Sequence, residues 1–187
     1  MNTPNKLTLL RICLVPVFLV FFLCGRIPLH NLWALLTFAA ASVTDAMDGH
    51  IARSRNLITD FGKFLDPVAD KVLVFAALIA FIDLKWASSV AVIIMVAREF
   101  LVSSLRMVAA GNGTVIAAGK LGKVKTAVTM ASIVTVLVLA AVMDCGLWTN
   151  LPIGAVSNWL VWISAVITVI SGIEYLWKNR SQFNSSK

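Results

Sequence analysis

The architecture and chemistry of this chain are decided by one stretch, DAMDGHIARSRNLITDFGKFLDPVAD, which runs from Asp45 to Asp70. Asp45 and Asp48 are three residues apart, and Asp66 and Asp70 are four apart, so each pair lies on one face of a helix. These are four of only nine acidic residues in the chain. Carboxylates inside hydrophobic segments are costly and are by default a functional-site hypothesis. Facing pairs from adjacent helices would surround a small volume with oxygen ligands, which predicts a site for hard divalent cations.

The composition indicates an integral membrane protein. Of 187 residues, 59% are hydrophobic and 13% charged, and the mean hydropathy is +0.89, whereas soluble domains average about 45–50% apolar and about 25% charged residues. The length suits a single domain over residues 1–187. The net charge of +7 raises the question of nucleic acid. Because the basic residues alternate with apolar segments and do not cluster with stacking aromatics, we expect no nucleic-acid binding.

Six apolar segments have lengths near the roughly 20 residues that a bilayer core requires. We therefore predict an all-α, polytopic membrane protein with six transmembrane helices. The predicted spans are Leu7–Cys24, Asn31–Arg53, about Gly62 to Ile82, Trp86 to about Ala110, Lys123–Val142 and Asn158–Trp177.

Charged residues interrupt these spans at a common depth. At 1.5 Å per residue, Asp45 lies about 20 Å from the start of the second helix, and Arg98 lies about 18 Å along the fourth. Asp66 and Asp70 open the third helix, which returns from the same side, and Glu174 comes late in the sixth. Charge at this depth is tolerated only in a polar cavity. We therefore expect a cavity cut into one leaflet.

The basic residues predict the orientation. Fourteen of the sixteen lysines and arginines fall on the side shared by both termini, and only Arg26 and Lys85 fall on the other. The positive-inside rule therefore places the termini and the cavity on the cytoplasmic side of the cell membrane. The outward halves of the spans, such as 72–82 and 127–142, are almost wholly apolar. This one-sided pattern favours an enzyme over a divalent-cation transporter, which needs a continuous polar path; a proton relay or structural polar network between helices is a further alternative.

The pattern D-x-x-D-G-x-x-A-R-x8-G-x-x-x-D-x-x-x-D is complete between Asp45 and Asp70 and resembles the signature of the CDP-alcohol phosphatidyltransferases. The resemblance implies a six-helix membrane enzyme with two divalent metal ions, Mg²⁺ or Mn²⁺. It also implies a reaction that moves a phosphatidyl group from CDP-diacylglycerol to an alcohol and releases CMP. The family's homodimer is implied by resemblance alone.

The resemblance assigns roles to residues of this stretch and of the N-terminus. It implies that Asp45, Asp48 and Asp66 are metal ligands, and that Asp70 both helps with the second metal and acts as the general base for the acceptor hydroxyl. It also implies contacts with the CDP-diacylglycerol nucleotide, from Gly49, Arg53, Thr59, Asn5 and Thr8. For Asn5 and Thr8, capping of the first helix is an equal alternative.

Several further motifs resemble the phosphatidylglycerophosphate synthase branch of that family. They are Asn5–Arg11, Arg98-Glu99-Phe100, Arg106 and Gly119–Thr126. The resemblance implies sn-glycerol 3-phosphate as the acceptor and a place in anionic phospholipid biosynthesis. Another acceptor, namely serine, inositol, inositol phosphate or phosphatidylglycerol, is an alternative. Serine and free inositol carry no phosphate, so with either as the acceptor a deep anion site at Arg98 and Arg106 would have no ligand.

A phosphorylated acceptor needs a fixed anion site, and the basic residues offer one. Arg98 is deep, Arg106 follows eight residues later on roughly the same face, and Lys123 begins the next helix. Arginine binds phosphate in a bidentate manner and lysine binds it as a point charge. Glu174 either accepts a hydrogen bond from the glycerol or pairs with one of these bases.

Five other polar residues are left outside the site. Lys120 and Lys125 are better explained by membrane orientation. Glu99 is interpreted as a partner for a neighbouring cation. His50 points away from the aspartate face, and His30 lies in an outer loop.

Overall fold

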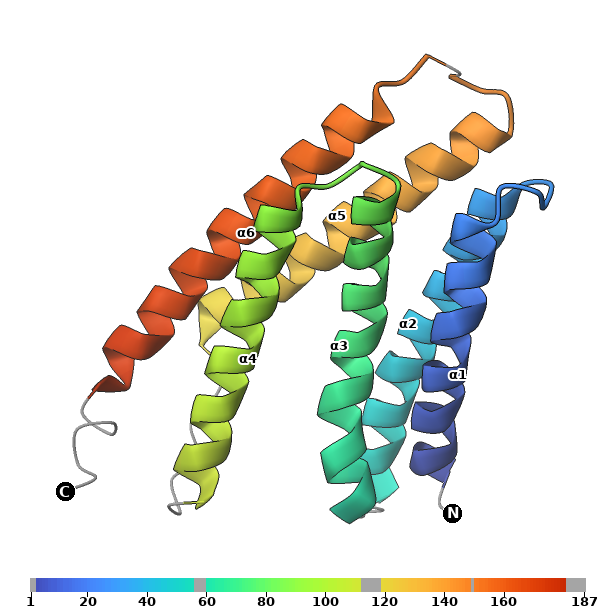
Figure 1. Cartoon of the computed structure of the whole chain (residues 1–187). Coiled ribbons are helices and arrows are strands. Elements are labelled where there is room, and N and C mark those ends of the chain that lie inside the picture. The colour runs from blue at the N-terminus through green and yellow to red at the C-terminus, as the bar shows by residue number, and fades with distance from the viewer. Residues whose placement is uncertain (1–2, 56–59, 112–118, 149, 181–187) are drawn as a thin grey trace. The chain divides into compact units, whose positions relative to one another are not determined.

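The structure is a computed structural model that describes the backbone of residues 3–55, 60–111, 119–148 and 150–180. Within these ranges it describes the side chains of 9–44, 71–111, 119–148 and 150–180. The described residues form six α-helices and no strand (Figure 1), which confirms the all-α expectation. The helices are α1 (Thr3–Leu23), α2 (His30–Arg55), α3 (Asp60–Asp83), α4 (Ser89–Gly111), α5 (Lys120–Asp144) and α6 (Ile153–Lys178).

Each helix starts one to five residues away from its predicted position, and two of these differences have a local cause. Helix α6 begins at Ile153, five residues before the predicted Asn158, because the helix follows directly on Pro152, whose fixed φ suits the start of a helix. Helix α4 begins at Ser89 rather than at Trp86. Lys85 has a positive φ of 60°, the left-handed conformation that commonly ends a helix, so a turn separates α3 from α4.

Two of the described helices are long and apolar enough to cross a membrane. They are α5 and α6, in which an 18-residue stretch has a mean hydropathy of 2.3 and 1.9 respectively. The apolar segment Leu9–Leu23 of α1 is shorter. Length and composition of α5 and α6 therefore indicate a membrane protein.

The chain divides into two compact units, each of which is described by itself. Unit 1 comprises residues 1–84 and 133–153, and unit 2 comprises residues 85–132 and 154–187. Helix α5 contributes to both units, because its first part, up to Ser132, belongs to unit 2 and the remainder to unit 1.

Unit 1 is held together by an aromatic cluster. Helix α1 packs against both α2 and α3 (Figure 1). Phe18 of α1 lies 5.5 Å from Phe22 and 5.6 Å from Phe38 of α2, and Phe22 lies 5.7 Å from Phe81 of α3, measured between ring centroids. All four rings are at most 1% exposed. Aromatic pairs at such distances contribute about 0.5–1.5 kcal/mol beyond the burial of their area.

A carboxylate from α5 caps the N-terminus of α2 inside unit 1. The backbone N–H of Asn31 donates to Asp144 Oδ2 at 2.9 Å, and Asn31 Nδ2 donates to Asp144 Oδ1 at 3.0 Å. His30 Nε2 lies 3.8 Å from the same Oδ1. The first N–H groups of a helix have no partner within the helix, and a negative charge is favourable there. Asp144 supplies both the acceptor and the charge.

Helix α6 in unit 2 has two opposite faces. Its buried face carries hydroxyl groups at helical spacing, from Ser157, Ser164, Thr168, Ser171 and Tyr175. Its exposed face is apolar, with Trp159, Ile163, Val166, Ile170, Ile173 and Trp177. A soluble helix shows the reverse arrangement, with its apolar stripe facing the core. The faces of α6 therefore suit a lipid surround.

Candidate functional site

The backbone places the four aspartates of the pattern at two matching levels. Helices α2 and α3 are consecutive and antiparallel (Figure 1). Asp48 lies seven residues before the last residue of α2, and Asp66 lies six residues after the first residue of α3, which is about 10 Å and about 9 Å along the respective axes. Asp45 and Asp70 each lie ten residues from the same ends, about 15 Å along. Asp48 and Asp66 thus lie at one depth of the hairpin, and Asp45 and Asp70 at a second, deeper one.

This donor set suits divalent cations of the Mg²⁺ or Mn²⁺ kind. Carboxylate oxygens are the ligands that such hard cations prefer, and the pattern supplies four carboxylates and no sulfur. The side chains of Asp45, Asp48, Asp66 and Asp70 lie outside the described ones. Their roles as ligands, and that of Asp70 as base, stay predictions.

The predicted nucleotide contacts lie partly on described backbone. Gly49 and Arg53 belong to α2, one and five residues after Asp48. Asn5 and Thr8 lie inside α1, which begins at Thr3, so they stand within the helix rather than before it. Their side chains lie outside the described ones, and Thr59 lies outside the described residues altogether. These contacts stay predictions.

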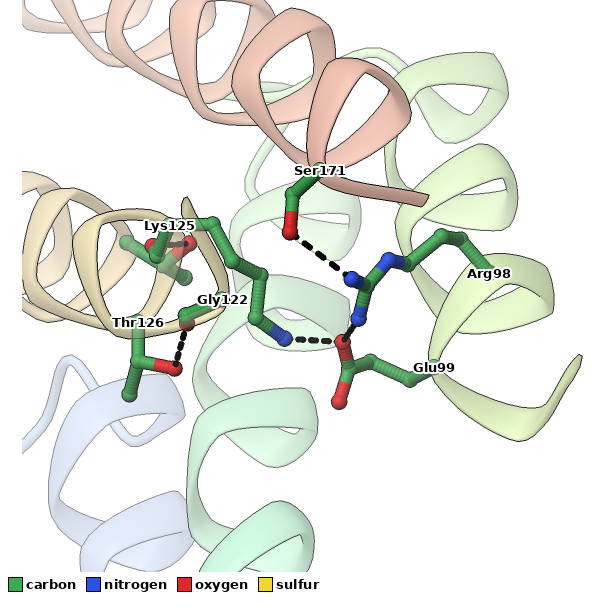
Figure 2. A network of polar contacts seen from close by, with 7 residues as sticks. Arg98, Glu99, Gly122, Lys125, Thr126 and Ser171 are labelled. Atoms are coloured by element: carbon green, nitrogen blue, oxygen red, sulfur yellow. Dashed lines mark hydrogen bonds and ion pairs between the residues drawn. The ribbon is translucent and has the colours of Figure 1, made fainter. Parts of the chain in front are cut away.

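Arg98 is fixed at the centre of a polar network in unit 2 (Figure 2). Its Nη1 donates to Glu99 Oε1 at 2.7 Å, and its Nη2 donates to Ser171 Oγ of α6 at 2.9 Å. Lys125 of α5 donates from Nζ to the same Glu99 oxygen. The three charged side chains are 12% (Arg98), 16% (Glu99) and 13% (Lys125) exposed. Glu99 is thus a partner of neighbouring cations, as predicted, while Lys125 is not a solvated charge.

Two glycines differ in the room that they leave for this network. A Cβ on Gly172 of α6 would lie 3.0 Å from Arg98 Cγ and 3.3 Å from Arg98 Nε. A Cβ on Gly122 of α5 would meet only Ser171 Oγ, at 4.0 Å. The Arg98 side chain therefore occupies space that only glycine at position 172 leaves open.

Arg106 is held by a different contact on the same two helices. Its Cζ lies 5.2 Å from the centroid of the Tyr175 ring, within the range of a cation–π interaction. Tyr175 is 6% exposed. Arg106 Nε and Tyr175 OH are buried and have no hydrogen-bond partner among the described residues. Arg98 and Arg106 both contact α6, at Ser171 and Tyr175 respectively, which confirms that they share a face of α4.

The other two predicted acceptor residues lie apart from these contacts. Lys123 of α5 is exposed. Glu174 forms an ion pair with Lys178 one turn later on α6, a cation that lies outside the predicted set of Arg98, Arg106 and Lys123. Glu174 Oε2 also lies 3.9 Å from the position of a Cβ built on Gly119.

Sequence reasoning missed Tyr175 and assigned Lys125 to orientation. A signal for Tyr175 was present, since Ser157, Ser164, Thr168, Ser171 and Tyr175 follow one another at intervals of seven, four, three and four. Such intervals keep side chains on one helix face. No comparable signal marks Lys125, because its burial depends on Glu99 of another helix.

Comparison with known proteins identifies the class. A family model described as CDP-alcohol phosphatidyltransferase matches residues 1–170. The chain belongs to this family and is a phosphatidyltransferase, which confirms the resemblance seen in the aspartate pattern.

Curated relatives share one name, CDP-diacylglycerol–glycerol-3-phosphate 3-phosphatidyltransferase. The relative from Bacillus subtilis (strain 168) is 43% identical over 99% of this chain and 98% of its own length. The relative from Rickettsia bellii (strain RML369-C) is 37% identical over 93% of both chains. The relative from Shigella flexneri serotype 5b (strain 8401) is 38% identical over 94% of this chain and 93% of its own.

Proposed function

We propose that the chain transfers the phosphatidyl group of CDP-diacylglycerol to sn-glycerol 3-phosphate, giving phosphatidylglycerophosphate and CMP. The observation that carries this function is the complete aspartate pattern of the family, on two consecutive helices, in a chain 36–43% identical to relatives that carry the name of this reaction. The reaction belongs to anionic phospholipid biosynthesis. Its lipid substrate and its lipid product reside in the membrane, which agrees with the apolar helices α5 and α6.

The aspartates would hold the metal ions on which this family generally depends. We assign Asp45, Asp48, Asp66 and Asp70 to two divalent cations. When bound, such ions neutralise the charge of the diphosphate and stabilise the departing phosphate. Asp70 accepts the proton of the acceptor hydroxyl, whose oxygen forms a bond to the phosphatidyl phosphorus while the bond from that phosphorus to CMP breaks. Gly49 and Arg53 would contact the nucleotide, together with Asn5, Thr8 and Thr59.

The acceptor would bind through its phosphate to Arg98 and Arg106, with Lys123 and Glu174 as further candidates. Arg98 Nε and Arg106 Nε are buried without an acceptor among the described residues. Leaving such a donor unpaired costs about 1–3 kcal/mol. A phosphate oxygen would relieve this cost at either position. Both guanidinium groups are held by α6, so little conformational entropy is lost when the anion binds.

We also propose how the chain lies in the membrane. The exposed face of α6 extends from Trp159 to Trp177, eighteen residues or about 27 Å, close to the roughly 30 Å of a bilayer core. Aromatic residues favour both membrane boundaries. We assign six spans in one domain over residues 1–187, with both termini and a polar cavity at the aspartates facing the cytoplasm. A homodimer is part of this proposal.

The first test is an acceptor screen with the purified protein, CDP-diacylglycerol and Mg²⁺ or Mn²⁺, with CMP release as the readout. We expect release with sn-glycerol 3-phosphate and not with serine, inositol, inositol phosphate or phosphatidylglycerol. If CMP is released only with a different alcohol, that alcohol is the acceptor, and the assignment to the family still holds. Transport of Mg²⁺ or Mn²⁺ into sealed vesicles without CMP release would instead support a cation transporter.

Two variants test the assigned roles. Asp70→Asn should abolish turnover while CDP-diacylglycerol binding stays largely intact; equal loss of both would contradict its role as base. Arg106→Ala should raise the KM for the phosphorylated acceptor more than that for the lipid donor. An unchanged acceptor KM would remove Arg106 from the site.

A further inference from the structure

Lys125 has the surroundings of a ligand-binding lysine rather than of an orienting charge. Its side chain is 13% exposed, and its ammonium group donates to Glu99 of another helix. A lysine that serves only to orient a span needs no protein partner and stays exposed, as Lys120 is on the same helix. Withdrawing an ammonium group from water is unfavourable unless a specific partner holds it. The fold therefore holds Lys125 in a specific, largely buried position.

Glu99 brings this ammonium group next to the Arg98 guanidinium. Both cations donate to the same atom, Glu99 Oε1 (Figure 2). Two groups that share one acceptor oxygen lie within about two hydrogen-bond lengths of each other, roughly 6 Å. One phosphate can accept from both at that separation. Ser171 holds the other terminal nitrogen of Arg98 and so fixes the plane of the guanidinium.

We propose that Glu99 is a positioning residue that holds Arg98 and Lys125 side by side, and that Lys125 binds the phosphate of the acceptor together with Arg98. This inference rests on the proposed function and adds Lys125 and Glu99 to the acceptor site. Arg98 supplies the planar donors and Lys125 the mobile point charge. Glu99 itself contacts the cations and does not touch the acceptor.

The alternative role for Glu99 is simple charge compensation, and the two roles predict opposite signs. A carboxylate that merely neutralises two cations weakens their attraction for an anion, so its removal would lower the acceptor KM. A carboxylate that aligns them is needed for binding, so its removal would raise the acceptor KM. Glu99→Gln keeps the size of the side chain, removes its charge and replaces one acceptor oxygen with an amide donor.

The test measures steady-state kinetics of the full-length protein in detergent micelles, with separate KM values for sn-glycerol 3-phosphate and CDP-diacylglycerol. We expect Glu99→Gln and Lys125→Met each to raise the acceptor KM about tenfold or more, the scale of one lost charge-assisted hydrogen bond. The donor KM and kcat should change less than threefold, about the limit of what one weak contact contributes. Glu99→Asp should recover part of the loss in acceptor affinity.

The matched control is Lys120→Met, which removes the same charge from an exposed site on the same helix. It should leave both KM values unchanged. A lower acceptor KM for Glu99→Gln, or equal effects of Lys120→Met and Lys125→Met, would overturn the proposal. If the donor KM rises instead, the two cations bind the diphosphate of the lipid substrate, which also overturns it.

The outcomes separate this inference from the proposed function. If the unaltered protein does not release CMP with sn-glycerol 3-phosphate, the function is wrong. If it does, and the Glu99 and Lys125 variants keep their acceptor KM, only the inference is wrong. Thermal unfolding of each variant shows whether it is folded. If Glu99→Gln does not fold, the acceptor KM of Lys125→Met can still be compared with that of Lys120→Met. This comparison decides whether Lys125 contacts the acceptor.

Discussion

Gly172→Ala tests how tightly Arg98 is held, because the new methyl group would point at its side chain. A Cβ at this position lies 3.0 Å from Arg98 Cγ and 3.3 Å from Arg98 Nε. Ordinary contacts between carbon atoms are about 3.5–4.0 Å, so the stem of Arg98 must withdraw by about 0.5–1 Å. It cannot swing away freely, because its head group donates to both Glu99 and Ser171.

The size of the effect follows from the bond that this withdrawal stretches. The distance from Arg98 Nη2 to Ser171 Oγ is 2.9 Å, and a shift of that size takes it beyond the roughly 3.2 Å limit of a good hydrogen bond. Losing a hydrogen bond to a charged group costs about 1.5–3 kcal/mol. Alanine in place of glycine returns about 0.8–1.0 kcal/mol of helix propensity. We expect a net loss of about 0.5–2 kcal/mol in unfolding free energy.

Gly122→Ala is the matched control, with the same chemical change in the same unit. Its Cβ would make one ordinary contact, 4.0 Å from Ser171 Oγ, so only the propensity gain of about 0.8–1.0 kcal/mol remains. We expect the two variants to move the thermal midpoint in opposite directions, Gly172→Ala down by roughly 1–8 °C and Gly122→Ala up by roughly 2–4 °C.

The assay is thermal unfolding in detergent micelles, followed by circular dichroism, with the acceptor KM measured in parallel. Gly172→Ala should also raise the acceptor KM, because it displaces Arg98. Equal stabilisation of both variants would refute the reasoning, since it would mean that the Arg98 side chain moves aside without loss.

Four further substitutions, at three positions, probe other contacts. Asp144→Ala removes the cap on Asn31 and should lower the unfolding free energy by about 0.5–2 kcal/mol, measured by chemical denaturation. Tyr175→Leu removes the ring beneath Arg106 and should raise the acceptor KM several-fold. Tyr175→Phe keeps the ring and removes a buried hydroxyl without a described partner, so it should not lower the thermal midpoint. Phe22→Ala removes a ring that is 1% exposed and leaves a cavity in the core. It should lower the unfolding free energy by about 3–5 kcal/mol.

The following results would contradict these expectations. Unchanged stability of Asp144→Ala would show that solvent caps α2 equally well. A large loss of stability in Tyr175→Phe would mean that its hydroxyl is bonded after all. For Phe22→Ala the control is Val20→Ala, at a site that is 58% exposed. Equal effects of these two substitutions would argue against the aromatic cluster as the core of unit 1.

The helices could be predicted from the sequence because hydropathy and spacing act along one segment at a time. The six apolar segments predicted from the sequence correspond to the six helices α1 to α6. Errors arose where a helix end depends on the backbone of a turn, as at Lys85 with its positive φ. The aspartate pattern could likewise be interpreted locally, since residues three and four apart share a face.

The network around Arg98 could be predicted only in part, because it joins three helices. The depth of Arg98 follows from counting residues along α4, and Glu99 was expected to pair with a cation. That this cation is Lys125, twenty-six residues later, depends on the contact between α4 and α5. Lys120 and Lys125 look alike in the sequence, yet one is exposed and the other largely buried.

The cap on α2 has a consequence for how the chain is made. Asp144 follows Asn31 by 113 residues, so at about 5–20 residues per second a ribosome needs roughly 6–23 s between the two. During synthesis the second helix therefore emerges long before the carboxylate that completes its first turn. Until then water or lipid head groups must accept the hydrogen bonds of the free backbone N–H groups in that turn. Truncated chains that stop before α5 would never gain the Asp144 carboxylate as an acceptor.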